Sequence, residues 1–421
     1  MSIANAAQAL AQEQEFVRPE LEYLCLSASV FWKRVQKNTS VKPVSDRPTR
    51  VPTVPSGGGK PSQANLNGGD LGLGSGPTGV PGQLTTTAFS HAFSYTAQAE
   101  YATDSDEKAI ENFATWTRAF APKQFANFLD VMAQGNGSGQ IDTILSTVLS
   151  GGLVVGIVVT NANFFLDDQD IDVWTGVGGT FITSVTVQSS DILGNTLWLQ
   201  TPAPATVVAG QGLFVSKSSA QANSSLMGIR AYQVGTNTGN WMGVQRSAWP
   251  GKYNTPNVPV NGALTPQSVR ALQSLVELSK GEDADDGMVA HCNVDARDAW
   301  EQNALLVQHI DMAQLKGDTS VDMLKRNAPT QIGGREMIVN PRALPGYIDF
   351  LKFKNIFSIE TAPVDFYSVA GQTLFPLYGA SGGIMTAMVF YMIYEGQIGM
   401  VQTRENAFMS GITIPKFILG H

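Results

Sequence analysis

The chain has 421 residues, of which 43% are hydrophobic, so it is long enough for several packed units and too apolar for wholesale disorder. Its net charge of −8 and its lack of any basic run argue against a general nucleic-acid binder, because affinity for phosphate backbones needs clustered Lys and Arg. Its most apolar stretches, at 153–159 and 384–394, are shorter than the ~20 residues that a membrane-spanning helix needs, so no membrane association is expected.

Charged residues are scarce and glycine is frequent. Only 15% of the residues are charged, against about 25% in a typical soluble domain, and there are 42 glycines and 21 prolines. Much of the surface is therefore uncharged. Either Ser, Thr, Asn and Gln solvate such a surface or neighbouring subunits cover it, and we favour the second interpretation. The cysteines, Cys25 and Cys292, lie far apart, so we expect buried thiols and no disulfide framework.

The N-terminal part of the chain changes character twice. Residues 5–37 have helical periodicity in parts and predict a helical arm. Between 48 and 88 there are ten glycines and six prolines, no apolar periodicity, and only three charged residues, which are Arg50, Lys60 and Asp70. Such a segment cannot form its own core, so we expect it to be either disordered or supported from outside its own domain, with a neighbouring subunit as the obvious support.

A strand and a long helix are predicted next. Large side chains alternate with small or polar ones over 85–102, which indicates a half-buried strand. The helix is expected over 104–134, capped by Thr103 or Asp104 and closed by the sequence GNGSG. Its apolar side is formed by Ile110, Phe113, Trp116 and Phe120. Because Pro122 interrupts the pattern, we predict either one kinked helix or two helices end to end.

The remaining sequence alternates between strand and helix patterns. Residues 153–217 contain short runs rich in Val, Ile and Thr, which predict a small barrel or sandwich of about six strands: LVVGIVVT, IDVWTG, TFITSVTV, NTLWLQ, ATVVAG and GLFVSK. A helix follows that Thr265 caps, Pro266 begins and Gly281 ends. Later strands (MVAHCNV, REMIVN, IMTAMVFYMIYEG, GITIPKFIL) alternate with short helices (ARDAWEQNALL, TSVDMLKRN), which is typical of an α+β domain.

No group of residues predicts a catalytic, cofactor or metal site. The histidines are His91, His291, His309 and His421, and none lies at a metal-ligand spacing from another. His291 and Cys292 are adjacent on a predicted strand, so they should point to opposite faces. The glycine clusters at 57–60 and 68–76 lack the context of a phosphate loop, and the acidic pairs at 167–168 and 285–286 lack the spacing of a calcium loop.

The order of these elements resembles the major capsid proteins of tailed bacteriophages with the Hong Kong 97-like fold. In that family an N-terminal arm precedes an extended loop that lies over the adjacent subunit and returns as a strand into a long spine helix. Peripheral and axial domains follow, and some members carry a β-rich insertion. The phrase IGGREMIVNPRALPG also looks like the axial domain of many such coats.

The resemblance implies an α+β fold with a small all-β insertion. The implied divisions are an N-terminal arm at 1–46, the extended loop and return strand at 47–101, the spine helix and start of the peripheral domain at 102–150, the insertion at 151–225, the peripheral domain at 226–287, and the axial domain with the C-terminal strands at 288–421.

The resemblance also implies a function without enzyme activity or cofactors. The chain would assemble through hexamers and pentamers into an icosahedral head shell in the virion, formed in the host cytoplasm. Arg50, Lys60 and Asp70 in the extended loop would contact neighbouring subunits. Separate scaffolding, portal and cement proteins would be partners, and double-stranded DNA would be packaged without sequence-specific binding. Lys60 sits where some members have a cross-linking lysine, but no partner Asn or assisting Glu can be matched.

Other classes of protein stay open at this point. An encapsulin-like nanocompartment shell shares the fold, and a peptide-binding groove or a copurifying cargo enzyme would identify it. A β-rich tail or adhesion protein would use the inserted unit for binding and would form trimers or fibres. An enzyme would need convergent nucleophile, base or metal groups, which these residues do not supply.

Overall fold

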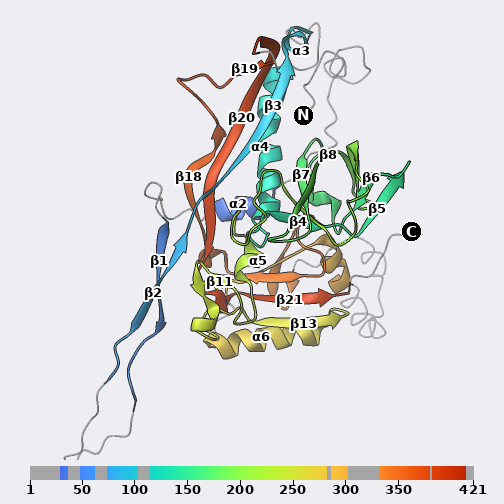
Figure 1. Cartoon of the computed structure of the whole chain (residues 1–421). Coiled ribbons are helices and arrows are strands. Elements are labelled where there is room, and N and C mark those ends of the chain that lie inside the picture. Colours follow the sequence, from blue (N-terminus) through green and yellow to red (C-terminus); the bar gives the residue numbers. More distant parts are fainter. Residues whose placement is uncertain are drawn as a thin grey trace, which may run out of the picture.

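The computed structural model describes residues 29–36, 48–61, 74–102, 113–281, 286–301, 331–379 and 382–413. Its parts are a body of two sheets with helices, a β-rich unit beside the body, and a narrow ribbon that projects from it (Figure 1). Most of the predicted N-terminal arm, both candidate caps of the long helix and the helix predicted at 319–327 lie outside the described residues. In these ranges no helix combines the length and the apolar character that crossing a membrane requires.

The first sheet of the body has four strands and is centred on β20 (Ile384–Met400). This strand pairs antiparallel with β18 (Ile356–Phe366), β19 (Phe375–Tyr378) and β3 (Thr87–Thr96). Helix α4 (Phe113–Met132) runs along the sheet (Figure 1). One hydrophobic cluster contains side chains from both layers, among them Phe125, Leu129, Met132, Phe390, Met392 and Tyr394. The apolar run that predicted a buried strand is therefore the centre of this layer.

The predicted strand over 85–102 is too long at its C-terminal end. Strand β3 stops at Thr96, and α3 (Ala97–Ala102) follows at once. The hydroxyl of Thr96 accepts a hydrogen bond from the backbone N–H of Ala99 at 3.2 Å, as an N-cap does. Large side chains stop alternating at Tyr95, and the sequence AQAEYA is rich in good helix formers.

The long helix is continuous through Pro122. Of the two predicted arrangements, the structure has one helix over the described part and not two end to end. A proline removes one helical hydrogen bond, but Phe125 and Leu129 beyond it are buried against the sheet. We attribute the continuity of the helix to this packing.

The second sheet of the body has six strands in the order β13-β21-β17-β14-β16-β15. Their bounds are Asn257–Gly262, Ala407–Ile412, Ile348–Leu351, Val289–Cys292, Arg335–Val339 and Gln331–Ile332. Helix α6 (Pro266–Lys280) packs on this sheet through Val269, Leu272 and Val276. As predicted, Thr265 caps this helix, Pro266 opens it and Gly281 ends it.

The expected boundary at residues 287 and 288 does not separate two cores. Helix α6, from the first side of that boundary, shares a hydrophobic cluster with β14, β17 and β21 from the other side. Strands β18 and β20 instead belong to the cluster that includes α4. The chain changes sheet between β20 and β21, where residues 401–406 with the 3-10 helix η7 (Thr403–Glu405) are the whole connection. A division along the sequence could not anticipate such a change of sheet.

The β-rich unit has seven strands in the order β4-β10-β7-β8-β9-β6-β5. In the same order the strands span Gln140–Thr143, Gly212–Val215, Asp170–Trp174, Phe181–Asp191, Thr196–Ala203, Leu153–Val158 and Ser146–Ser150. The strands at the two ends of this order, β4 and β5, are consecutive in the chain with only residues 144 and 145 between them. The sheet therefore curls into a small barrel, in which β4 and β5 are joined by the chain at residues 144 and 145 and not by pairing with each other.

The extent of this unit differs from the prediction. The unit begins at Gln140 and not at residue 151. Strands β4 and β5 were not recognised in the sequence, because their sequences QIDT and STVLS are short and largely polar. The run ATVVAG at 205–210 is a turn and not a strand. Pro204 precedes this run, the backbone N–H of Val207 donates to the Pro204 carbonyl at 3.1 Å, and Val207 is buried in the barrel core. The valines of this run suggested a strand, whereas Val207 is buried from a turn.

The segment at 48–88 contains regular structure that was not predicted. Strands β1 (Thr49–Ser56) and β2 (Thr78–Leu84) form an isolated two-stranded antiparallel ribbon. Pro52 faces Pro81 across it. Proline is tolerated here because each strand of a two-stranded ribbon has an outer edge where no hydrogen-bond donor is needed.

A buried polar network joins the two sheets of the body. Helix α2 (Phe31–Gln36) begins beside α4, and the Asp130 carboxylate of α4 accepts a hydrogen bond from the backbone N–H of Trp32 at 2.7 Å. The same carboxylate accepts from the Asn340 amide, beyond β16, at 2.8 Å. Asn340 in turn lies 3.3 Å from His291 Nε2 on β14. Asp130 is fully buried, so these donors replace water around its charge.

We predict that Asp130→Asn lowers the free energy of unfolding by about 2–4 kcal/mol, because an amide nitrogen would face buried donors that now point at a carboxylate. Urea unfolding followed by tryptophan fluorescence measures this change. The matched control is Asp191→Asn at an exposed turn of the barrel, which should change the free energy of unfolding by less than about 0.5 kcal/mol. Equal effects of the two substitutions would contradict the role of the network.

His91 on β3 makes stability depend on pH. Its ring stacks on Phe125 of α4, and burial lowers its pKa to about 4, although a hydrogen bond with Gln124 opposes the shift. The unfolded chain therefore binds a proton more readily than the folded chain between pH 6.5 and about 4. Stability from the neutral ring is fully present above pH 6.5 and is lost as the pH falls towards 4.

We predict that the free energy of unfolding of wild type falls by about 2 kcal/mol more than that of His91→Phe between pH 7 and pH 4.5. Parallel urea curves at each pH measure the difference, and equal losses would contradict the assignment.

Candidate intersubunit interface

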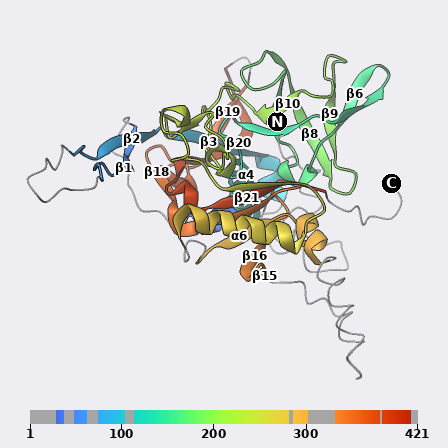
Figure 2. The ribbon, with the colours of Figure 1, turned by 90° about the horizontal axis from the view of Figure 1, so that it is seen from below.

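The β1–β2 ribbon projects from the body (Figures 1 and 2). We call this ribbon the arm; it is distinct from the N-terminal arm expected at 1–46. Beyond the paired strands the backbone N–H of Gly59 donates to the Ser75 carbonyl at 2.7 Å, so the ribbon continues past Ser56. At about 3.3 Å per residue its described part is about 30 Å long. Val54 is 63% exposed, and most other side chains of the two strands are exposed or half-buried. The arm therefore has no core of its own.

The root of the arm is firmly attached to the body. Leu84 is buried in the main core. Alongside it lies a turn formed by β11 (Asn240–Trp241) and β12 (Val244–Gln245). The backbone N–H of Gln83 donates to the Met242 carbonyl at 2.7 Å, and the Thr53 hydroxyl lies 2.9 Å from the Tyr253 hydroxyl. These contacts fix the direction in which the arm leaves the body.

A buried arginine supports this root. Arg246, in the 3-10 helix η3 (Arg246–Ala248), is completely buried and donates to the carbonyls of Tyr253 and Tyr232. Tyr232 ends the short helix α5 (Ile229–Tyr232), and its hydroxyl donates to the Ile398 carbonyl of β20 at 2.6 Å. Burial lowers the pKa of Arg246 to about 10, so the guanidinium remains charged at neutral pH. The root is thereby tied to the central strand of the body.

Of the sequence-predicted contact residues, Arg50 and Lys60 lie in the described part of the arm, and they do not form one site there. Arg50 is exposed on β1 and is paired in register with Gln83 of β2. Lys60 is exposed beyond the end of β1. Asp70 lies outside the described residues. Among the residues that the structure describes, none covers Arg50 or Lys60.

Sequence reasoning missed the residues that hold the root. Trp241 and Tyr253 stack with their ring centroids 4.5 Å apart, and the Trp241 indole donates to the Met400 carbonyl at 2.9 Å. The signal available was an aromatic-rich stretch in a turn-rich region at 240–253. Aromatic side chains in such a region indicate buried anchors, but the sequence does not identify what they anchor.

Exposed apolar side chains gather at two other places. At the end of the four-stranded sheet they are Tyr367, Val369, Tyr378, Ile384, Met385 and Met388. On the barrel they include Leu145, Leu149, Leu153 and Trp198. Clusters of this kind mark interaction surfaces more often than isolated exposed leucines do.

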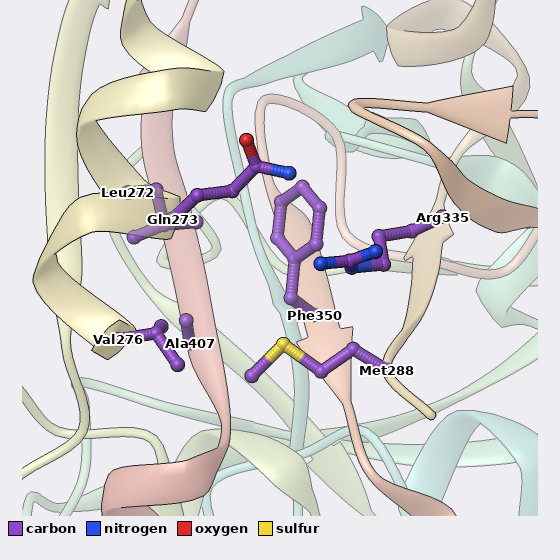
Figure 3. A pocket seen from close by; sticks show the side chains of 7 residues that line it. All are labelled: Leu272, Gln273, Val276, Met288, Arg335, Phe350 and Ala407. Carbon is purple, nitrogen blue, oxygen red and sulfur yellow. The ribbon is translucent and has the colours of Figure 1, made fainter. Parts of the chain in front are cut away.

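The cavities that we found are small for a substrate. One lies between α6 and the six-stranded sheet, where Gln273 and Arg335 flank the Phe350 ring (Figure 3). Its volume of about 10 Å³ is near that of a single water. A neighbouring polar depression of about 220 Å³ is lined by Arg270, Gln273, Ser274, Glu277 and Arg335. Small-molecule sites usually have about 300–1,000 Å³.

The potentially reactive side chains that the structure describes are far from one another or inert. Cys292 and His291 lie on opposite faces of β14, as predicted, with Cys292 under α6 and His291 against Phe31. Burial raises the pKa of the Cys292 thiol to about 12, which disfavours the reactive thiolate. Burial, followed by repulsion from Asp167, raises the pKa of Asp168. Among described residues no three His, Cys, Asp or Glu side chains are placed to hold a metal ion.

Gly82 allows the arm to approach its root. A Cβ at this position would lie 3.1 Å from both the Met242 Cβ and the Trp241 ring, whereas a Cβ at Gly79 of the same strand meets only the Thr53 carbonyl at 3.9 Å. We predict that Gly82→Val lowers the free energy of unfolding by about 1–3 kcal/mol through overpacking, while Gly79→Val changes it by less than about 0.5 kcal/mol. Thermal unfolding of both variants measures the difference. A larger effect at Gly79 would contradict this account of the root.

The sequence matches no family model, and no curated protein is significantly similar to it. The structure is similar to a chain of the capsid asymmetric unit of cyanophage A-1(L), with a TM-score of 0.55 and 11% identity over 94% of this chain and 97% of that chain. It is also similar to the capsid of Myoviridae phage XM1 (TM-score 0.46, 9% identity, 94% and 97% of the two chains). An encapsulin complex from Synechococcus elongatus gives a TM-score of 0.45 at 6% identity, over 96% and 95%. The first similarity extends over nearly the whole of both chains, and the chain therefore has the α+β, Hong Kong 97-like fold of tailed-phage capsid proteins.

Proposed function

We propose that the chain is the major capsid protein of a tailed bacteriophage, which assembles through hexamers and pentamers into the icosahedral head shell around double-stranded DNA. The observation that carries this proposal is the arm, a ribbon about 30 Å long that is anchored at its root and whose residues are mostly exposed or half-buried. The capsid fold over 94% of the chain supports it.

The arm suits a contact that closes into rings. Folding an extended ribbon costs conformational entropy, and this ribbon buries almost nothing of its own to offset that cost. A neighbouring subunit that receives the arm would supply the missing burial. Such a head-to-tail contact repeats around a ring when the rotation closes. We propose that Arg50, Lys60 and Asp70 contact the neighbour there.

We also propose an assignment of the two sheets to the family's domains. The resemblance places the spine helix at the start of the peripheral domain, and α4 is the helix at that place in the chain. The four-stranded sheet packs with α4, so it would belong to the peripheral domain. The six-stranded sheet with α6 would be the axial domain. The barrel at 140–215 would be the insertion.

Net charge is consistent with a shell that holds DNA without binding it tightly. The chain carries a net charge of −8, so its surface would not retain phosphate backbones as a basic wall would. Scaffolding, portal and cement proteins would be separate partners, and the protein would reside in the virion after assembly in the host cytoplasm. No enzyme activity, cofactor or membrane contact is proposed.

The arm offers the sharpest test. In the register of the ribbon, Thr53 is paired with Val80, so residues 54–79 can be replaced by the two-residue turn Asn-Gly without disturbing the root. We predict that this variant folds, with an unchanged near-ultraviolet spectrum, but forms no stable shells. Light scattering and electron microscopy of the purified protein measure assembly, with the full chain as the reference.

Charge variants test the proposed contacts in the arm. Arg50→Ala and Lys60→Ala should each lower the stability of the shell by up to about 1 kcal/mol per contact, and Asp191→Ala on the barrel serves as the control. Normal shells from the shortened variant would refute the role of the arm. A full chain that forms only trimers or fibres would refute the capsid function and favour a tail or adhesion protein. Shells that enclose a cargo enzyme in place of DNA would favour a nanocompartment.

A further inference from the structure

The β5–β6 hairpin of the barrel projects from the molecule on the side away from the arm (Figures 1 and 2). Leu145, Leu149 and Leu153 are 55%, 61% and 46% exposed on it. Residues 143–166, which include the whole hairpin, contain no charged side chain. A protruding, uncharged hairpin with exposed leucines is unfavourable in water and indicates an interaction surface.

One edge of this hairpin is open. Strand β5 ends the strand order of the barrel and, within the described part of the chain, pairs only with β6. Proteins usually block such an edge with a charge, a proline or a covering segment. The sequence of β5, STVLS, has neither a charge nor a proline. Its free backbone groups can therefore receive another strand.

The face of the sheet beside this edge is partly apolar. Trp198 of β9 is paired in register with Gly156 of β6, which is paired with Val148 of β5. A Cβ on Gly156 would lie 3.3 Å from the Trp198 ring, so glycine lets the indole lie across the sheet. Trp198 is still 40% exposed. An added strand would thus meet an apolar shelf next to the open edge.

The charges of the barrel are all acidic and lie away from the tip of the hairpin. Residues 140–215 contain six aspartates and no Lys, Arg, His or Glu. Asp142 and Asp172 are buried, and Asp191 ends β8 opposite Thr196, which also pairs with Val158 at the base of the hairpin. Asp167 is close to this end of β8, because it accepts a hydrogen bond from the backbone N–H of Ser190 at 3.1 Å. The hairpin tip, at Ser150 and Leu153, is at the opposite end.

We propose that the open edge of β5 pairs antiparallel with the β5 edge of a second copy of this chain, across a two-fold axis, and joins two barrels through one continuous sheet. Two acidic barrels repel each other wherever their aspartates meet, and the uncharged hairpin is where they can approach. A basic partner protein would instead be attracted to the aspartate end. A two-fold contact also requires a self-complementary surface, which an antiparallel strand edge provides.

This inference rests on the proposed shell function, because a single contact of this size would be weak. Five residues per strand bury much less than the ~1,600 Å² of a stable pairwise interface. In a closed shell many copies of the contact act together, so weak pairing is sufficient. We therefore expect the pairing in assembled shells and not between free subunits.

The first test places a charge on the edge. Leu149→Lys should lower the urea concentration at which shells dissociate, because it places a positive charge of each copy on the edge where the two copies pair. The matched control is Leu193→Lys, which makes the same change at an exposed leucine in the β8–β9 turn and should leave that midpoint unchanged. Subunits of both variants should unfold at the wild-type temperature. Equal dissociation midpoints for the two variants would overturn the inference.

The second test uses disulfide formation in shells. Thr147→Cys, Val148→Cys and Leu149→Cys are made one at a time, because pairing about any of these positions brings a cysteine opposite its own copy. At least one should give about tenfold more covalent dimer on mild oxidation than Leu193→Cys or wild type. Shells that form normally but give no dimer from all three would overturn the inference alone. Failure to form shells at all would refute the proposed function and this inference with it.

Discussion

The arrangement of the body depends on the hydrogen bonds that the buried Asp130 carboxylate accepts. The carboxylate is fully buried, and it receives hydrogen bonds from the backbone of α2 and from Asn340 beyond β16. Hydrogen bonds to a buried charge stabilise by about 1.5–3 kcal/mol each, and an unpaired charge at that place would cost more. These partners come from segments that are 98 and 210 residues away in the sequence. Helix α4, helix α2 and the second sheet are therefore held in one relative position.

This rigid arrangement gives the arm a defined direction. Leu84 and Trp241 at the root of the arm belong to the same hydrophobic cluster as α4 and β20. The Trp241 indole donates to the Met400 carbonyl of β20, and Arg246 donates to the carbonyl of Tyr232, whose hydroxyl is hydrogen-bonded to β20. The arm therefore cannot swing without disturbing the core. The body thus determines where the ribbon points, while the described part of the ribbon has little burial of its own. A contact with another molecule is the remaining source of such burial.

The sequence predicted elements with strong local signals and failed where long-range pairing decides. The cap and bounds of α6, the alternation in β3 and the apolar run of β20 were all readable. The chain's change of sheet at 401–406 was not, because both flanking segments simply look like strands. The ribbon formed by β1 and β2 was not predicted either, because prolines in its strands argue against a sheet unless both outer edges are free. The roles of Asp130 and Arg246 could not be predicted, because nothing in the sequence shows that these charged side chains are buried. For the candidate contact residues, the sequence indicated only the segment of the chain in which they lie.

The low charge of the chain has a structural location. In the described parts of the arm the charged residues are Arg50 and Lys60, and residues 143–166 of the hairpin have none. Both are two-stranded projections that expose backbone edges, which is where soluble monomers usually place charge to prevent association. Charge is thus missing at the places where it would block pairing with another chain. An uncharged edge is a hazard for a protein that works alone, because it promotes aggregation. For a subunit that is meant to be covered by its neighbours, the same edge permits assembly, and the scarcity of charge then follows from the function that we propose.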